Sequence, residues 1–192
     1  ETDGHDACAV GGGNTPEVAQ EFATNHLLAR EEQRAEQALW NGDLGNVPNF
    51  VGANGFDAPL SLGTFAADAA EEALALVESQ IATSYGSQGV IHMGRGAATL
   101  LAKYLEKRGG RLYTRALDTP VVAGAGYPAF QIVGSGAMFG YRGDVLASSN
   151  RPGDLLDRAT NTMYAVAERE YVVGIDPCVL VKAFITEPQE QA

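Results

Sequence analysis

The fold is decided by residues 14–43, which read NTPEVAQEFATNHLLAREEQRAEQALWNGD. Asn14 can cap a helix, Pro16 suits its first turn, and a Glu stands three residues after Asn14. Turn residues follow Trp40 and end the helix there. At 1.5 Å per residue this helix would be about 37 Å long, and its apolar stripe is thin and broken. Such a pattern is typical of a helix that lies across a surface or an interface.

The composition indicates a folded and strongly acidic chain. Its 192 residues are 45% hydrophobic and 19% charged, which excludes a disordered protein and fits one domain or two small ones. With 13 basic and 24 acidic residues the net charge is −11, so most of the surface would repel phosphate unless the few Arg and Lys cluster. Two cysteines exclude a disulfide scaffold, and no run of about 20 apolar residues predicts a membrane span.

The remaining pattern predicts short elements around this helix. Residues 1–13 are predicted to be an arm, and residues 41–63 a Gly/Asn/Pro-rich loop with Phe50 among its apolar anchors. Next we expect a helix at 64–84 capped by Thr64, a strand at 90–93, and a helix at 97–107 closed by Gly109 and Gly110. Strands are expected at 111–114, 120–123, 130–133 and 137–141. The chain is expected to end with a helical turn at Leu155 and Leu156 and a long hairpin of 161–173 with 178–185. This order predicts an α+β fold, because no βαβ unit repeats.

One string has the pattern of a nucleotide site. Residues 90–98, VIHMGRGAA, predict a strand, a Gly94-x-Gly96 turn and a helix start, which is how a dinucleotide pyrophosphate is held. However, Thr99 replaces the third glycine, and no strand with an acidic end follows about 20 residues later. A tight strand-to-helix turn is therefore the favoured interpretation.

The titratable residues suggest no catalytic or metal site. His5, His26 and His92 are far apart and have no metal-ligand spacing. His92 could serve as a general base, but such a residue is more often hydrogen-bonded in a core. Glu168-Arg169-Glu170 places two carboxylates on one face of a strand and a guanidinium on the other, as solvated edge charges or as ion pairs between subunits. We therefore expect no catalytic, cofactor-binding or metal residues, no cofactor, and a protein that is not an enzyme.

Taken in order, these elements resemble those of tailed-bacteriophage major capsid proteins of the Hong Kong 97 fold. The long helix resembles their spine helix, and residues 38–43, ALWNGD, resemble the turn that ends it. The elements at 64–84 and 90–93 resemble parts of the axial domain, and residues 119–122, TPVV, resemble a later strand. The segment 161–186 is similar to the strands that return to the peripheral domain. The resemblance lies in this succession and covers nearly the whole chain.

The resemblance implies a structural major capsid protein with two domains. The peripheral domain would comprise residues 1–52 and 155–192, with the spine helix and the long hairpin, and the axial domain residues 53–154. Identical subunits would form hexamers and pentamers of an icosahedral shell that encloses double-stranded DNA without specific binding. Scaffolding, portal or decoration proteins would be further partners and no membrane would be involved; the protein would reside in the virion after assembly in the host cytoplasm.

Two alternatives remain open at this point. A nanocompartment shell of the same fold that holds protein cargo would share all of these elements. A nucleotide-binding enzyme that uses the Gly94/Gly96 turn is the less favoured alternative.

One feature departs from the family pattern. In the capsid family an amino-terminal arm and an extended hairpin precede the spine helix, whereas only about 14 residues precede it in this sequence.

Overall fold

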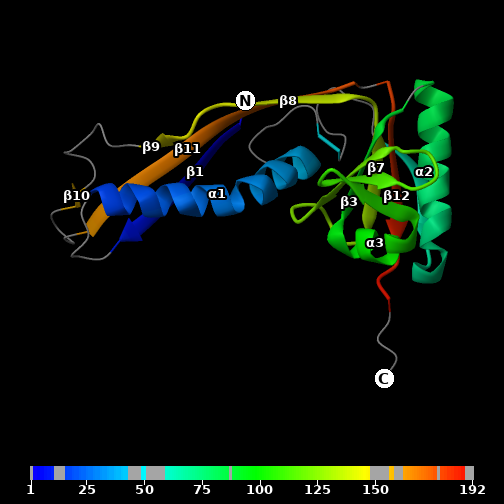
Figure 1. Cartoon of the computed structure of the whole chain (residues 1–192), viewed down its shortest axis with the longest axis horizontal. Helices are drawn as coiled ribbons and strands as arrows, with labels where there is room; N and C mark the ends of the chain where they lie inside the picture. Colours follow the sequence, from blue (N-terminus) through cyan, green and yellow to red (C-terminus); the bar gives the residue numbers. More distant parts are fainter. Residues whose placement is uncertain are drawn as a thin grey trace. The chain divides into compact units, whose positions relative to one another are not determined.

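The computed structural model describes residues 2–10, 16–42, 49–50, 59–86, 88–147, 156–157, 162–176 and 178–188. The chain forms two compact units (Figure 1): unit 1 comprises Glu1–Arg34 and Gly140–Val172, and unit 2 comprises Ala35–Phe139 and Val173–Ala192. These boundaries differ from those predicted for the peripheral domain, residues 1–52 and 155–192, and the axial domain, residues 53–154. The assignment of peripheral and axial positions in a shell stays a prediction.

Unit 1 is built on a five-stranded sheet around β11 (Thr162–Ile175), whose last residues belong to unit 2. The strands that pair with β11 are β1 (Thr2–Val10), β8 (Met138–Arg142), β9 (Leu146–Ala147) and β10 (Leu156–Asp157). β1 runs antiparallel to β11, from Thr2 opposite Tyr171 to Val10 opposite Met163. The prediction of an arm is therefore wrong for residues 2–10. A ladder satisfies backbone groups whatever the side chains are, so a polar segment can pair with a distant strand.

The long helix α1 (Pro16–Asn41) has nearly the predicted bounds. Its buried positions within unit 1 recur every four residues: Ala19, Ala23, Leu27 and Glu31. The first three pack against Ala165 and Ala167 of β11, because residues four apart lie on one face of a helix. Glu31 continues the same buried stripe, so its charge requires a partner inside unit 1.

Unit 2 is built on a seven-stranded mixed sheet. In order across the sheet, its strands are β2 (Leu60–Phe65), β12 (Leu180–Ile185), β7 (Gln131–Ser135), β3 (Val90–Gly94), β6 (Pro120–Gly124), β5 (Arg111–Thr114) and β4 (Leu105–Arg108). β12 pairs with β2 and β3 with β6 in parallel, and the other pairs are antiparallel. α2 (Ala70–Tyr85) packs on β12, β7 and β2 (Figure 1), and α3 (Arg95–Leu100) follows β3.

The core of unit 2 includes the side chains between α2 and this sheet. Its fully buried members include Val77, Ile91, Met93, Leu101 and Ile132. Gly134 on β7 faces α2, and a Cβ at this position would lie only 2.8 Å from side-chain carbons of Val77 and Ile81. Glycine therefore lets the two α2 side chains pack directly on the backbone of β7.

The predicted helix at 97–107 is wrong in its second half. α3 ends at Leu100, a 3-10 turn spans Ala102–Tyr104, and residues 105–108 form β4. Gly109 and Gly110 have φ of 56° and 82° and connect β4 to β5 as a two-residue hairpin turn, not as a helix cap. The apolar spacing of this segment fits a helix, but the pairing with β5 determines its conformation.

Strand β2 was not predicted, and it lies at the end of the segment expected to be a loop. Thr64 belongs to β2 and caps no helix; a 3-10 turn at Ala67–Ala69 precedes α2, which begins at Ala70. β2 pairs in parallel with β12, from Leu60 opposite Val181 to Phe65 opposite Ile185. The partner lies about 120 residues away in the sequence, so no local pattern indicates the strand.

The predicted long hairpin of 161–173 with 178–185 is wrong. Both segments are strands, but β11 belongs to the sheet of unit 1, whereas β12 is flanked by β2 and β7 in the sheet of unit 2. The short connection between them suggested a hairpin because it resembles a turn. Of the predicted helical turn, Leu156 lies in the short strand β10 and Leu155 lies outside the described residues.

Candidate functional site

Gly94 is the last residue of β3 and Gly96 lies in the first turn of α3, so the strand passes directly into the helix without the predicted separate turn, and this Gly94-x-Gly96 segment is packed against its own chain. A Cβ at Gly94 would overlap the backbone of Pro128 and Ala129, and one at Gly96 would lie 2.7 Å from the ring of Phe130 in the same segment. The Ala97 N–H donates to the Ala129 carbonyl oxygen of the same segment at 2.7 Å. The glycines thus permit a close approach of the chain to itself. This packing argues against a pyrophosphate site, which needs free amides at the helix start.

His92 on β3 is a buried, hydrogen-bonded core residue. Its Nδ1 lies 3.2 Å from the Tyr127 hydroxyl, and its Nε2 lies 3.3 Å from the Ser135 Oγ. The Ser135 hydroxyl donates to the Gly136 carbonyl oxygen at 3.1 Å, so it accepts a hydrogen bond from Nε2–H. Nδ1 then accepts from Tyr127, and both ring nitrogens of a neutral imidazole are satisfied. Burial lowers the pKa of His92 to about 3, so the ring stays neutral at physiological pH.

Aromatic rings surround this histidine within unit 2. The Phe50 ring lies 4.6 Å from the His92 ring, and the Trp40 ring lies 5.2 Å from the Tyr127 ring, both measured between centroids. Phe50 is buried, as its interpretation as a loop anchor predicted. Burial, and then the nearby Glu36 carboxylate, raises the pKa of Tyr127. The arrangement suits a rigid core and holds His92 away from solvent.

The main cluster of charged side chains in unit 1 centres on Glu31. The Arg169 Nη1 lies 2.7 Å from Oε2 and 3.1 Å from Oε1 of Glu31, and the Tyr171 hydroxyl donates to Oε2 at 2.6 Å. The exposed Arg142 adds a longer contact of 3.3 Å from its Nη1 to Oε1. Burial, followed by the hydrogen bond to Glu31, raises the pKa of Tyr171. The Glu31 carboxylate on the buried stripe of α1 therefore has the partner that its charge requires, and it is both ion-paired and hydrogen-bonded.

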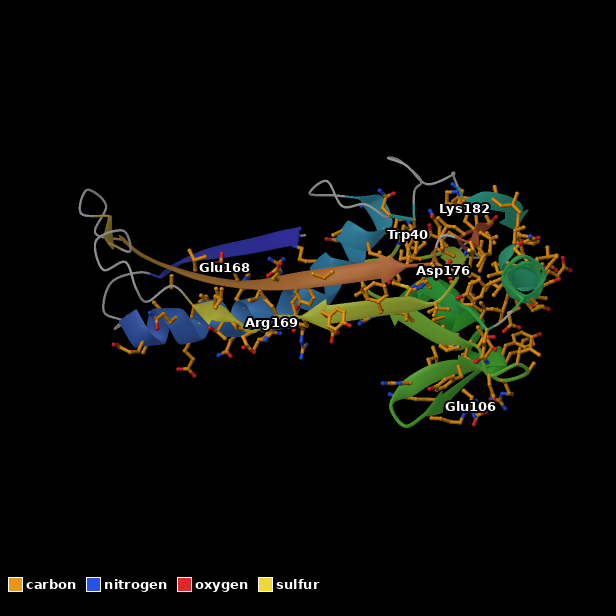
Figure 2. All side chains as sticks on the ribbon, turned by 90° about the horizontal axis from the view of Figure 1, so that it is seen from above. Trp40, Glu106, Glu168, Arg169, Asp176 and Lys182 are labelled. Carbon is orange, nitrogen blue, oxygen red and sulfur yellow. The ribbon has the colours of Figure 1, made fainter. Side chains whose placement is uncertain are left out.

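Arg169 differs from the prediction of a solvated edge charge. Its side chain is only 12% exposed and points to Glu31, whereas Glu170 on the opposite face of β11 is exposed (Figure 2 labels Arg169 and Glu168). The alternation along the strand placed the guanidinium and the carboxylates on opposite faces correctly. The partner was missed because Glu31 lies 138 positions earlier, although its place on the helix stripe was a usable signal.

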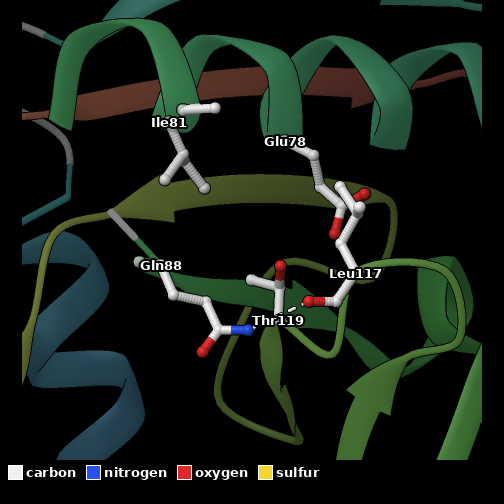
Figure 3. Close-up of a pocket in the computed structure, with 7 residues that line it drawn as sticks. Glu78, Ile81, Gln88, Leu117 and Thr119 are labelled. Atoms are coloured by element: carbon white, nitrogen blue, oxygen red, sulfur yellow. Dashed lines mark hydrogen bonds between the residues drawn. The ribbon is translucent and has the colours of Figure 1, made fainter. Parts of the chain in front are cut away.

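A surface pocket of unit 2 lies beside α2 (Figure 3). It has a volume of about 190 Å³ and is lined by Glu78, Ile81, Ala82, Gln88, Gly89, Leu117 and Thr119. The Gln88 Nε2 donates to the Leu117 carbonyl oxygen at 3.0 Å, and the Thr114 hydroxyl donates to Glu78 at 2.6 Å. The side chains of Gln88 and Glu78 therefore each have a hydrogen-bond partner within the chain. The lining contains no pairing of a nucleophile with a base.

Among the side chains that the structure describes, no three of His, Cys, Asp or Glu gather closely enough to hold a metal ion. Within the described part of the chain, no helix has both the length and the apolar character needed to cross a membrane.

Comparisons with known proteins give a clear result at the level of structure. No family model and no curated protein matches the chain. Solved structures do match it, at sequence identities of about one residue in ten. The holo-SrpI encapsulin complex of Synechococcus elongatus has 9% identity and a TM-score of 0.55, over 95% of this chain and 73% of that one.

Two further structures match over the same extent. That of Mycobacterium phage Che8 has 13% identity and a TM-score of 0.57, over 95% of this chain and 70% of that one. The virus-like particle from Pyrococcus furiosus has 10% identity and a TM-score of 0.55, over 95% of this chain and 76% of that one. At these identities the likeness shows a shared fold. The chain has the α+β Hong Kong 97-type fold of phage capsid proteins and encapsulins.

Proposed function

We propose that this protein is a structural shell subunit whose identical copies form the hexamers and pentamers of an icosahedral capsid around double-stranded DNA. The observation that carries the proposal is the match over 95% of the chain to a phage structure and to shell subunits of other origin. Because a match along nearly the whole chain includes both units, the proposal concerns the entire molecule and not one module.

The surface of unit 1 supports self-association. The apolar residues of its described core are mostly alanines, whereas several large apolar side chains are on its surface. Phe22 is 54% exposed, Tyr141 71% and Leu146 63%. Exposed side chains of this size gain free energy when a neighbouring subunit covers them. Identical subunits in head-to-tail contact close into rings, as hexamers and pentamers require.

A structural role makes no demand for catalytic chemistry, and we propose that the protein is not an enzyme. The two strongest candidates for such chemistry are engaged by the chain itself: His92 is hydrogen-bonded in the core, and the Gly94-x-Gly96 turn is filled by residues 128–130. The net charge of −11 suits a container for DNA, because fixed cations are what bind phosphate.

A second candidate is a shell of the same fold that encloses protein cargo. The match to the SrpI encapsulin complex, with a TM-score of 0.55, favours it about as strongly as the phage match favours a virion. In the capsid case the protein would reside in the virion after assembly in the host cytoplasm, and scaffolding, portal or decoration proteins would be further partners.

The test is to express the chain, determine particle size by light scattering, and inspect the product by electron microscopy. We expect closed particles, and nuclease-protected DNA inside them if the capsid proposal holds. Particles that contain protein and no nucleic acid would establish the cargo shell instead. A chain that stays monomeric at high concentration and forms no particles would refute both.

A further inference from the structure

The hairpin of β4 and β5 with its flanking residues concentrates positive charge in an otherwise acidic chain. Residues 103–115 hold five of the 13 Lys and Arg and one of the 24 Asp and Glu, a net charge of +4. The other residues hold 8 basic and 23 acidic side chains, a net charge of −15. The basic residues of this chain therefore cluster, which is the condition under which an acidic protein can still bind phosphate.

Two acidic neighbours of this hairpin, Glu106 and Asp118, are paired with one arginine. Arg108 forms ion pairs with Asp118 and, at 3.7 Å, with Glu106, and its guanidinium lies 4.9 Å from the centre of the Tyr113 ring. Lys107 and Arg111 form no ion pair with any residue that the structure describes, and both are exposed. Two cations thus remain free for an external anion.

The free cations lie on opposite faces of a narrow ribbon. Arg111 stands opposite Arg108 next to the turn, and Lys107 stands opposite Leu112 one position further in. Because side chains alternate along a strand, Lys107 and Arg111 point to opposite faces. Two like charges directly opposite each other, as at Arg108 and Arg111, weaken a strand pair by themselves. Stability of the hairpin therefore does not explain this arrangement.

The tip of the hairpin is open. A Cβ added at Gly109 or at Gly110 would meet no atom within 4 Å, so no other part of the described chain packs against the turn. A two-stranded ribbon with cations on both faces fits between two rows of phosphates better than it fits one flat acidic surface. The major groove of duplex DNA admits such a ribbon. Figure 2 marks this hairpin by the label of Glu106.

We infer that the β4–β5 hairpin is a contact site for the phosphate backbone of double-stranded nucleic acid, with Lys107 and Arg111 as the phosphate-binding residues. We expect it to act without base recognition, because contacts of Lys and Arg with phosphates carry no sequence information by themselves. The inference goes beyond the shell function proposed above, since it assigns one segment of the subunit to the nucleic acid. A Lys on the edge strand β4 also blocks edge-to-edge pairing, but that role does not involve Arg111 on β5.

The test measures the binding of short duplex DNA to the full chain, taken from the unassembled fraction so that every hairpin is accessible. Fluorescence anisotropy at a series of salt concentrations gives the slope of log K against log salt. We expect K107Q/R111Q to bind at least about tenfold more weakly at low salt and to reduce the slope by about 2, since each phosphate contact contributes about 0.9. Two duplexes of unrelated sequence should show the same loss.

The matched control is R30Q/R34Q, which removes the same charge from two exposed positions of α1 and should bind like the parent chain. K107R/R111K keeps the charge and should also bind like the parent, which separates charge loss from misfolding. Equal slopes for K107Q/R111Q and the parent, an equal loss in the control, or no DNA binding by the parent at low salt would overturn the inference. The inference would also be overturned if K107Q/R111Q bound DNA like the parent but no longer formed particles, because the hairpin would then contact a second copy of the chain instead of DNA. Absence of particles from the parent chain tests the proposed shell separately.

Discussion

The two units hold together in different ways. Unit 2 packs large apolar side chains such as Ile91 and Met93 between α2 and its sheet, and its buried polar residue His92 is neutral and hydrogen-bonded. Among its described side chains, unit 1 packs α1 on β11 mainly through alanines and places a charged cluster around Glu31 on the same stripe. Burying an alanine contributes much less free energy than burying an Ile. Unit 2 therefore resembles a self-sufficient core, whereas unit 1 relies on polar pairing and on whatever covers its exposed apolar residues.

The largest effect is expected from breaking the charged cluster of unit 1. Glu31→Ala leaves the Arg169 guanidinium buried without its carboxylate, and such a loss destabilises by about 3–5 kcal/mol. Urea denaturation should show this loss, and hydrogen exchange should locate it in α1 and β11. Glu32→Ala, one position away and exposed, is the control and should stay within about 0.5 kcal/mol of the parent. If the two variants unfolded at the same urea concentration, the cluster would have no stabilising role.

The apolar core of unit 2 should respond almost as strongly. Ile91→Ala removes three carbons from a fully buried position and should destabilise by about 2–5 kcal/mol, because a cavity remains. Ile91→Val, with one carbon fewer, should cost about 0.5–1.5 kcal/mol. In hydrogen exchange the loss should appear in β3 and α2 and spare the amides of β1. An equal loss of protection in β1 would mean that the two units unfold together, and the contrast between them would be weaker than stated.

His92 makes the stability of unit 2 depend on pH. Its folded pKa of about 3 lies below the unfolded value of about 6.5, so only the unfolded state takes up a proton between these values. The contribution is fully present above about pH 6.5 and is lost as pH falls toward 3, at up to about 1.4 kcal/mol per pH unit. The variant His92→Asn should lack this component when unfolding is followed by tryptophan fluorescence across the range. A parallel pH dependence in both proteins would contradict the assignment.

The smallest effect on the isolated subunit is expected from the exposed surface of unit 1. Leu146→Ser replaces a side chain that is 63% exposed, so the free energy of unfolding should change by less than about 0.5 kcal/mol. Particle formation should nevertheless require a higher protein concentration, because an apolar contact with a neighbour is lost. Leu76→Ser, at an exposed position of α2, is the counterpart in unit 2. If Leu76→Ser raised the protein concentration needed for particle formation and Leu146→Ser did not, the apolar contact surface would lie on unit 2 instead of unit 1.

Elements with strong local signals could be predicted closely. The long helix was predicted from its capping residues and turn, and it spans Pro16–Asn41. Strands bounded by glycines, such as β3 and β7, were predicted to within about two residues at each end. Strands β1, β2 and β4 could not be predicted, because each is stabilised by a partner and not by its own residues. The false hairpin of β11 and β12 has the same origin, since strand pairing is a choice among distant segments.

For the candidate sites too, the role of single residues could be predicted, whereas their distant contact partners could not. The interpretation of His92 as a hydrogen-bonded core residue is confirmed, but its partners Tyr127 and Ser135 come from other parts of the sheet and its loops. The alternation of Glu168, Arg169 and Glu170 on the two faces of a strand was predicted, but Glu31 was not identified as the partner of Arg169. Their contact joins two segments 138 positions apart, which no spacing in the sequence encodes.

The α+β class, the long helix and the acidic charge could be predicted from the sequence, because they depend on composition and on residues close together in the chain. Only the folded chain shows which strands pair, that Glu31 and Arg169 neutralise each other, and that Lys107 and Arg111 form no ion pair with the described residues near an open hairpin tip. The physical reason is the range of the interactions. Capping and turn preferences act over a few residues, whereas hydrogen-bond ladders, ion pairs and packing are set by distance in space.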